Sequence, residues 1–343
     1  MTRSTYTVVG ETKSTAQLGF EWAVVALSLW MVGGVHLDAW AHHQFDETLE
    51  TFFTPWHGVL YSGFLALATL IVGRVVVNRR KVQSWRESIP AGYGLALFGI
   101  GLFLAGGVGD MLWHLLFGIE VNVEALLSPT HLLLALGAGL MVTGPVRSAL
   151  QQQTFRWPAL VGLALLLSVF SFFTAFANPL SDGQFASGLR PANLQIAATM
   201  EGQGVAAILL QTFLWLGVTL FALRQWRLPF GAMTVLFGLS SLLTVSVHQA
   251  WYFLPATFVT GLVADVLVQH WQVTQRHLLR LLAFVLPVLF YALYFLTVAL
   301  EAGLWWRVHL WGGSLVMAGL LGWLLSYAFF APQVSKDGSV GVG

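Results

Sequence analysis

The sequence predicts an all-α protein that crosses a membrane about ten times. Apolar residues make up 57% of the chain and charged residues only 9%, and the mean hydropathy is +0.75. Since a soluble domain carries roughly 25% charged residues, this composition excludes an ordinary soluble enzyme or a nucleic-acid-binding protein. The chain also falls into apolar segments of about the 20 residues that a spanning helix needs.

Ten segments are long and apolar enough to be expected as spanning helices. They cover residues 17–41, 53–77, 91–117, 129–147, 157–178, 202–223, 229–251, 255–273, 279–300 and 306–330. We expect helices 1–4, within 17–147, to form one part of the protein and the six helices of 148–330 to form another. The polar ends, 1–16 and 331–343, are expected to be tails.

The positive charges predict the orientation of these helices. If the N-terminus is cytoplasmic, ten spans place every lysine and arginine on the inner side except Arg190 and Arg307. Cytoplasmic loops of membrane proteins are enriched in these residues. We therefore expect both termini to lie on the cytoplasmic side. We expect the protein itself to lie in the cell membrane of a bacterium or archaeon.

The same topology brings most histidines to the outer side, where acidic residues also gather. The outer histidines are His36, His42, His43, His57, His114, His131, His248 and His309. A surface rich in imidazole and carboxylate groups, with almost no cations, is typical of a metal or cation site.

One pattern occurs twice among these residues. In each copy an Asp stands four residues before a His, and a Glu stands seven residues before a second His, which itself follows a Ser/Thr-Pro pair by two. The first copy is Asp38, His42, Glu50, Thr54-Pro55 and His57, and the second is Asp110, His114, Glu124, Ser128-Pro129 and His131. We interpret the pattern as a duplicated site on helices 1–2 and 3–4.

The spacing predicts how each copy is arranged. Residues four apart share one face of a helix, so each Asp should lie beside its first His. Ser or Thr followed by Pro is a common helix start, which puts the second His in a first turn. There the helix dipole disfavours imidazolium, and neutral imidazole is the form that binds metal. Glu50 and Glu124 would be additional ligands or hydrogen-bond acceptors around them.

The metal is left open by these ligands. Carboxylate oxygen and imidazole nitrogen suit copper, zinc, iron or manganese, and the absence of cysteine excludes thiolate sites.

The residues DAWAH and FFTPWH resemble the metal-binding hairpin in the C subunit of the copper membrane monooxygenases, which oxidise methane or ammonia. The similarity covers residues 33–140. It implies that Asp38, His42 and His57 form a first metal site and that His114 and His131 form a second, with Asp110 where the family has Asn. It also implies a copper cofactor and oxygenase ancestry.

Other polar residues have two interpretations. His36 and His43 lie off the face shared by Asp38 and His42, and His248 and His309 lie at the outer ends of helices seven and ten. Each is either part of the surroundings of a site or an ordinary interfacial residue. Asp265, near the middle of helix eight, is either a proton or ion relay or a hydrogen-bonded helix contact.

The first hypothesis is an outer-face metalloprotein that binds copper, or else iron or zinc, and oxidises a small apolar substrate with dioxygen. Its partners would be the lipid bilayer, that substrate, and membrane subunits or further copies of the chain. The rivals are a metal-ion or proton-coupled transporter, a zinc-dependent lipid hydrolase, and a non-catalytic subunit in which the polar cluster ties helix ends together. The hydrolase ranks below the others because helices seven to ten contain no His-x3-His.

Overall fold

The structure is a computed structural model that describes residues 5–45, 53–118, 122–181, 185–271 and 276–330. Regular structure within these residues is helical, apart from one isolated β-bridge. The prediction of an all-α protein is therefore confirmed. The chain divides into two compact units, Met1–Val169 and Phe170–Gly343.

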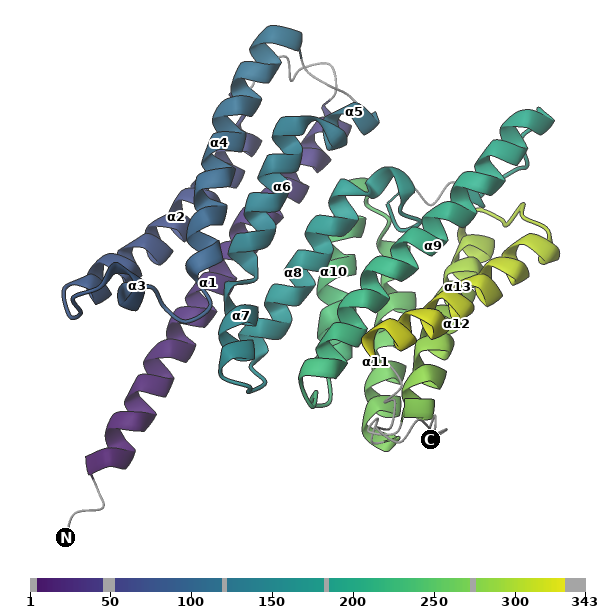
Figure 1. Cartoon of the computed structure of the whole chain (residues 1–343). Helices are drawn as coiled ribbons and strands as arrows, with labels where there is room; N and C mark the ends of the chain where they lie inside the picture. Colours follow the sequence, from purple (N-terminus) through teal and green to yellow (C-terminus); the bar gives the residue numbers. More distant parts are fainter. Residues whose placement is uncertain (1–4, 46–52, 119–121, 182–184, 272–275, 331–343) are drawn as a thin grey trace, which may run out of the picture. The chain divides into compact units, whose positions relative to one another are not determined.

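The first unit contains the helices of both sequence motifs. They are α1 (Thr5–Gln44), α2 (Pro55–Arg79), α3 (Trp85–Ser88), α4 (Gly94–Phe117), α5 (Asn122–Leu127), α6 (Pro129–Val142), α7 (Gly144–Gln151) and most of α8 (Trp157–Phe173). Helix α1 packs on α2, and α4 packs on α6 (Figure 1). The two pairs also touch, since α2 contacts α4 and α1 contacts α6.

Glycines set the closest approach within each pair. A Cβ atom on Gly34 would lie 2.7 Å from Cα of Leu60 in α2, and one on Gly106 would lie 3.1 Å from the backbone nitrogen of Leu134 in α6. Each glycine stands four residues before the Asp of its motif, and each leucine three residues after the second His. A Cβ atom on Gly63 would likewise lie 2.7 Å from the Met31 nitrogen, and one on Gly137 2.7 Å from the Phe103 nitrogen, so each pair packs closely from about one turn beyond the predicted ligands onward.

A buried ion pair fastens α1 at a point distant from its predicted ligands. The Glu21 carboxylate is fully buried and accepts hydrogen bonds from Arg156 Nη1 at 3.2 Å and from Ser148 Oγ at 2.7 Å. These contacts join α1 to α7 and to the start of α8. Because a helix rises 1.5 Å per residue, the pair lies roughly 25 Å along α1 from Asp38.

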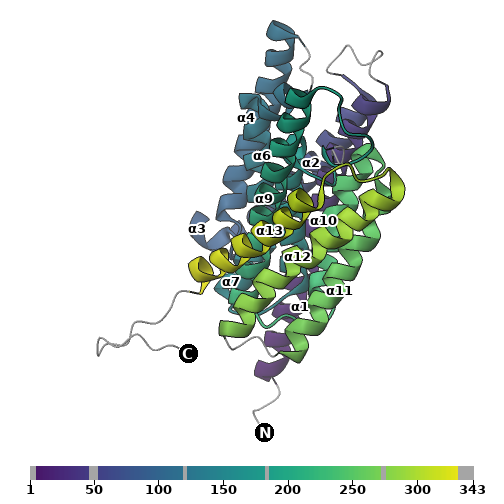
Figure 2. The same cartoon turned by 90° about the vertical axis from the view of Figure 1, so that its right-hand side faces the viewer.

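The second unit contains the remaining long helices. They are α9 (Leu194–Gln225), α10 (Ala232–His248), α11 (Leu254–His270), α12 (Arg276–Glu301) and α13 (Val308–Phe329). Helix α12 packs on both α11 and α13, α13 also packs on α9, and α10 packs on α11 (Figure 2). Aromatic side chains form much of the core, including Phe253, Tyr291, Tyr294 and Trp306.

Within the residues that the structure describes, eight helices are long and apolar enough to cross a membrane, which indicates an integral membrane protein. The other two predicted spans correspond to α8 and α10, which are apolar but have 17 residues each. The count of ten, the inward termini and the outward site remain predictions. The predicted division at residue 147 differs from the division into units, whose boundary falls inside α8.

Candidate metal centre

The first motif forms a triad at the junction of α1 and α2. Asp38 and His42 lie in the last two turns of α1, and His57 lies in the first turn of α2. Thr54 caps α2, because its side chain accepts a hydrogen bond from the backbone nitrogen of His57 at 3.1 Å, and Pro55 is the first helical residue. The helix start predicted from Thr-Pro is confirmed.

The potential ligand atoms of this triad all lie within 4.8 Å of one another. His57 Nδ1 is 3.5 Å from Asp38 Oδ1, and His42 Nε2 is 3.9 Å from Asp38 Oδ2. The three side chains are partly buried. Three such atoms at this spacing can surround one ion after small shifts, since metal–ligand bonds are about 2.0–2.2 Å long.

The second motif forms a triad at the ends of α4 and α6. Asp110 and His114 lie in the last two turns of α4, and His131 lies in the first turn of α6. Ser128 caps α6 by accepting a hydrogen bond from the backbone nitrogen of His131 at 3.4 Å. Its potential ligand atoms also lie within 4.8 Å of one another.

Both histidines of the second triad direct Nε2 at the same carboxylate oxygen. His131 Nε2 is 3.1 Å and His114 Nε2 is 3.6 Å from Asp110 Oδ1, and Asp110 is only 1% exposed. His114 Nδ1 lies 3.2 Å from the carbonyl oxygen of Gly118, so this nitrogen carries the proton. When His114 is neutral, its Nε2 presents a lone pair to the Asp110 carboxylate, an arrangement that a bound cation stabilises. A histidine whose other nitrogen is bonded to a carbonyl is also the usual form of a metal ligand.

Tyr61 lies between the two triads. Its ring stacks on His57 with centroids 6.3 Å apart, and a Cβ atom on Gly107 of α4 would lie 2.9 Å from Tyr61 Cε1. Tyr61 interacts electrostatically with Asp38 and Asp110, which also interact with each other. The two triads therefore belong to one polar cluster. Tyr61 was not among the predicted site residues, although its position four residues after His57 places both on one helix face.

Aromatic rings border the first triad on the side of α1 and α2. Trp40 and Trp56 are in edge contact at 6.0 Å, and Phe45 stacks on Trp56 at 6.2 Å. Phe45 is 44% exposed. The three rings therefore form an apolar cluster from residues next in sequence to the ligands of the first triad.

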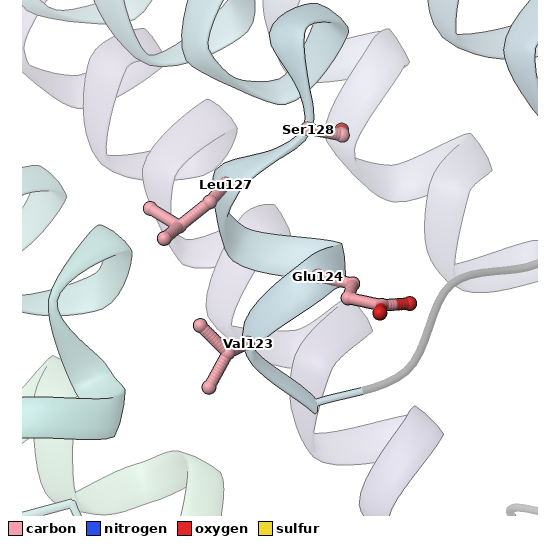
Figure 3. A pocket seen from close by; sticks show the side chains of 4 residues that line it. All are labelled: Val123, Glu124, Leu127 and Ser128. Carbon is pink, nitrogen blue, oxygen red and sulfur yellow. The ribbon is translucent and has the colours of Figure 1, made fainter.

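Of the two predicted additional ligands, only Glu124 falls within the described residues, and Glu50 lies outside them. Glu124 is exposed on α5 and lines an open depression of about 370 Å³ with Val123, Leu127 and Ser128 (Figure 3). In Figure 3 the side chains of Glu124 and Ser128 extend to one side of α5, and those of Val123 and Leu127 to the other. Glu124 is not a member of the second triad. Its neighbour Ser128 is linked to that triad, because Ser128 Oγ lies 2.9 Å from His131 Nδ1.

The other two histidines of the first unit lie outside the triads. His36 is buried, its Nδ1 donates to the carbonyl oxygen of Val32 at 2.9 Å, and its Nε2 accepts from Ser168 Oγ at 3.2 Å. His36 thus joins α1 to α8. His43 is exposed at the end of α1.

The remaining candidates belong to the second unit. His248 is exposed at the end of α10, and His309 is exposed in the first turn of α13. Asp265 is buried in α11, where Oδ1 accepts from the Met233 nitrogen at 2.9 Å and Oδ2 accepts from the nitrogen and hydroxyl of Thr234 at 3.0 and 2.7 Å. Asp265 therefore caps the start of α10, which is the hydrogen-bonded helix contact that the sequence left as one alternative.

Comparison of this chain with protein families, characterised proteins and solved structures finds no match. The resemblance to the copper membrane monooxygenases therefore rests on the motif residues alone.

Proposed function

We propose that this protein is a membrane metalloprotein whose first unit binds a transition-metal ion in each of two Asp-His-His triads at the outer face of the membrane. The observation that carries the proposal is the convergence, twice, of one carboxylate and two imidazoles from a pair of packed helices. Ionisable residues inside a membrane are costly and are usually functional.

Copper is the ion that we propose first, with iron and zinc as alternatives. The imidazole and carboxylate ligands suit all three, and the motif resemblance favours copper. Asp38, His42 and His57 would hold one ion, and Asp110, His114 and His131 the other. Copper or non-haem iron bound there would supply one-electron and dioxygen chemistry.

The residues around the triads support oxidation of a small apolar substrate. Trp40, Phe45 and Trp56 form an aromatic cluster that would bind such a substrate near the first triad, and the substrate would reach it from the bilayer. The carboxylate and imidazole groups of the two triads would attract metal cations to this end of the first unit.

Transport is a weaker candidate. It requires polar waypoints across the bilayer, and the buried acid of the second unit that the sequence singled out, Asp265, is occupied in capping α10. A non-catalytic subunit with an unused cluster would bind no metal.

Metal analysis by mass spectrometry on detergent-purified protein tests the proposal. We expect two ions per chain in the wild type, one for each triad, and the loss of one ion in either His57→Ala or His131→Ala. His43→Ala is the matched control, because His43 is a nearby histidine outside both triads, and it should keep both ions. Absence of stoichiometric metal from membranes prepared without chelator would refute the proposal.

A further inference from the structure

The two triads contain the same ligand types but differ at the residue before the second histidine. This residue is Trp56 in the first motif and Thr130 in the second. Each follows the Pro of the helix start, so each occupies the same place in the first turn of its helix. The difference replaces a hydroxyl with an indole ring beside the metal ligands.

In the second triad the hydroxyl holds the carboxylate in place. Thr130 Oγ1 donates a hydrogen bond of 3.0 Å to Asp110 Oδ1. Ser128 Oγ lies 3.3 Å from Thr130 Oγ1 and 2.9 Å from His131 Nδ1. Two adjacent hydroxyl groups therefore fix both Asp110 and His131 before any metal binds.

In the first triad Thr54 Oγ1 lies 2.9 Å from His57 Nδ1, but among the described residues no hydroxyl group reaches Asp38 Oδ1. Asp38 Oδ1 is buried and makes no hydrogen bond with any residue that the structure describes. Its nearest ligand partner, His57 Nδ1, is 3.5 Å away, beyond a typical N–H···O distance. The Trp56 ring instead packs against Trp40 and Phe45.

We propose that the two triads differ in affinity for divalent transition metals, that the Asp110 triad fills first, and that Thr130 sets the difference. This inference rests on the proposed metal-binding function. Ligands already held in their bound geometry lose less freedom when the ion binds. Hydrogen-bond partners of metal ligands are commonly worth about 10–100-fold in affinity. Thr130 is thus a positioning residue, which acts on the metal through Asp110.

Zinc titration of the metal-free, full-length protein in detergent tests the order of filling, because zinc has no redox chemistry. The His57→Ala variant reports on the second triad and His131→Ala on the first. We expect the second triad to bind zinc about 10–100-fold more tightly. Equal affinities, or tighter binding by the first triad, would overturn the inference but leave the proposed function intact. If neither variant binds zinc, the proposed function itself fails.

Substitution of Thr130 tests its role. In the His57→Ala background, Thr130→Val should weaken zinc binding by about 10–100-fold, whereas Thr130→Ser, which keeps the hydroxyl, should preserve the affinity. In the His131→Ala background, Thr130→Val should leave the first triad unchanged, which also shows that the chain is folded. An unchanged second triad in Thr130→Val, or equal losses in the Val and Ser variants, would refute the assignment.

Discussion

Replacing Asp265 with Asn separates a structural role of this residue from a role in ion movement. The carboxylate accepts hydrogen bonds from two backbone N–H groups and one hydroxyl at the start of α10. Asn has the same shape but only one acceptor oxygen. In either orientation of its amide, one backbone N–H of Met233 or Thr234 faces an NH₂ group and loses its acceptor.

The cost follows from this loss. An unsatisfied buried donor costs about 1–3 kcal/mol, so we expect the free energy of unfolding of Asp265→Asn to fall by about 2 kcal/mol. Asp265→Ala, which leaves both N–H groups without an acceptor, should lose about twice as much. Loss of a helix N-cap alone typically costs about 0.5–2 kcal/mol, which agrees with this range.

Thermal unfolding of the detergent-solubilised protein, followed by tryptophan fluorescence, measures this effect. For a unit of this size, about 2 kcal/mol corresponds to a fall in Tm of about 4–8 °C. Glu301→Gln, an exposed carboxylate in the same unit, is the matched control and should not change Tm. Metal content should be unchanged, because both triads lie in the first unit. Unaltered stability together with loss of metal uptake would refute this reasoning and restore the relay interpretation.

Two further substitutions test the first unit. Gly34→Ala places a Cβ atom 2.7 Å from Leu60 Cα, whereas Gly33→Ala, the control, meets no atom within 4 Å. We expect Gly34→Ala to lower the free energy of unfolding by about 1–3 kcal/mol and to weaken zinc binding by the first triad alone. Equal zinc affinities of the two variants would contradict this expectation. Glu21→Gln leaves Arg156 without its buried partner, so the free energy of unfolding should fall by about 3–5 kcal/mol. Glu87→Gln, which changes an exposed carboxylate, is the control. Equal Tm values for the two variants would show that the ion pair contributes little.

The local features of the site could be predicted from sequence because they depend on short spacings. The position of Asp38 four residues before His42 placed both on one face, and Thr54-Pro55 marked where α2 begins. The same rules applied to Asp110 and Ser128.

Features that depend on contacts between distant segments could not be predicted in this way. Ser168 lies 132 positions from His36 in the sequence but forms a hydrogen bond with it. Thr130 of α6 donates a hydrogen bond to Asp110 of α4. Tyr61 fits between the triads because Gly107 leaves room for its ring. The periodicity of a sequence does not specify which helices pack against each other. The role of the Thr130 hydroxyl in the second triad was therefore not predicted.

If the hairpins tilt about the glycine contacts nearest the triads, those of Gly34 and Gly106, these contacts are pivots for the helices that carry the ligands. Asp38 and Asp110 stand four residues beyond these contacts, a distance of about 6 Å along the helix axis. A tilt of one helix by about 10° around its pivot would then displace the carboxylate by only about 1 Å, whereas the far end of a 25-residue helix such as α2 would swing several times further. Helices tilt to match the thickness of the surrounding bilayer. With these close contacts about one turn from the ligands, each triad would keep its dimensions in membranes of different thickness.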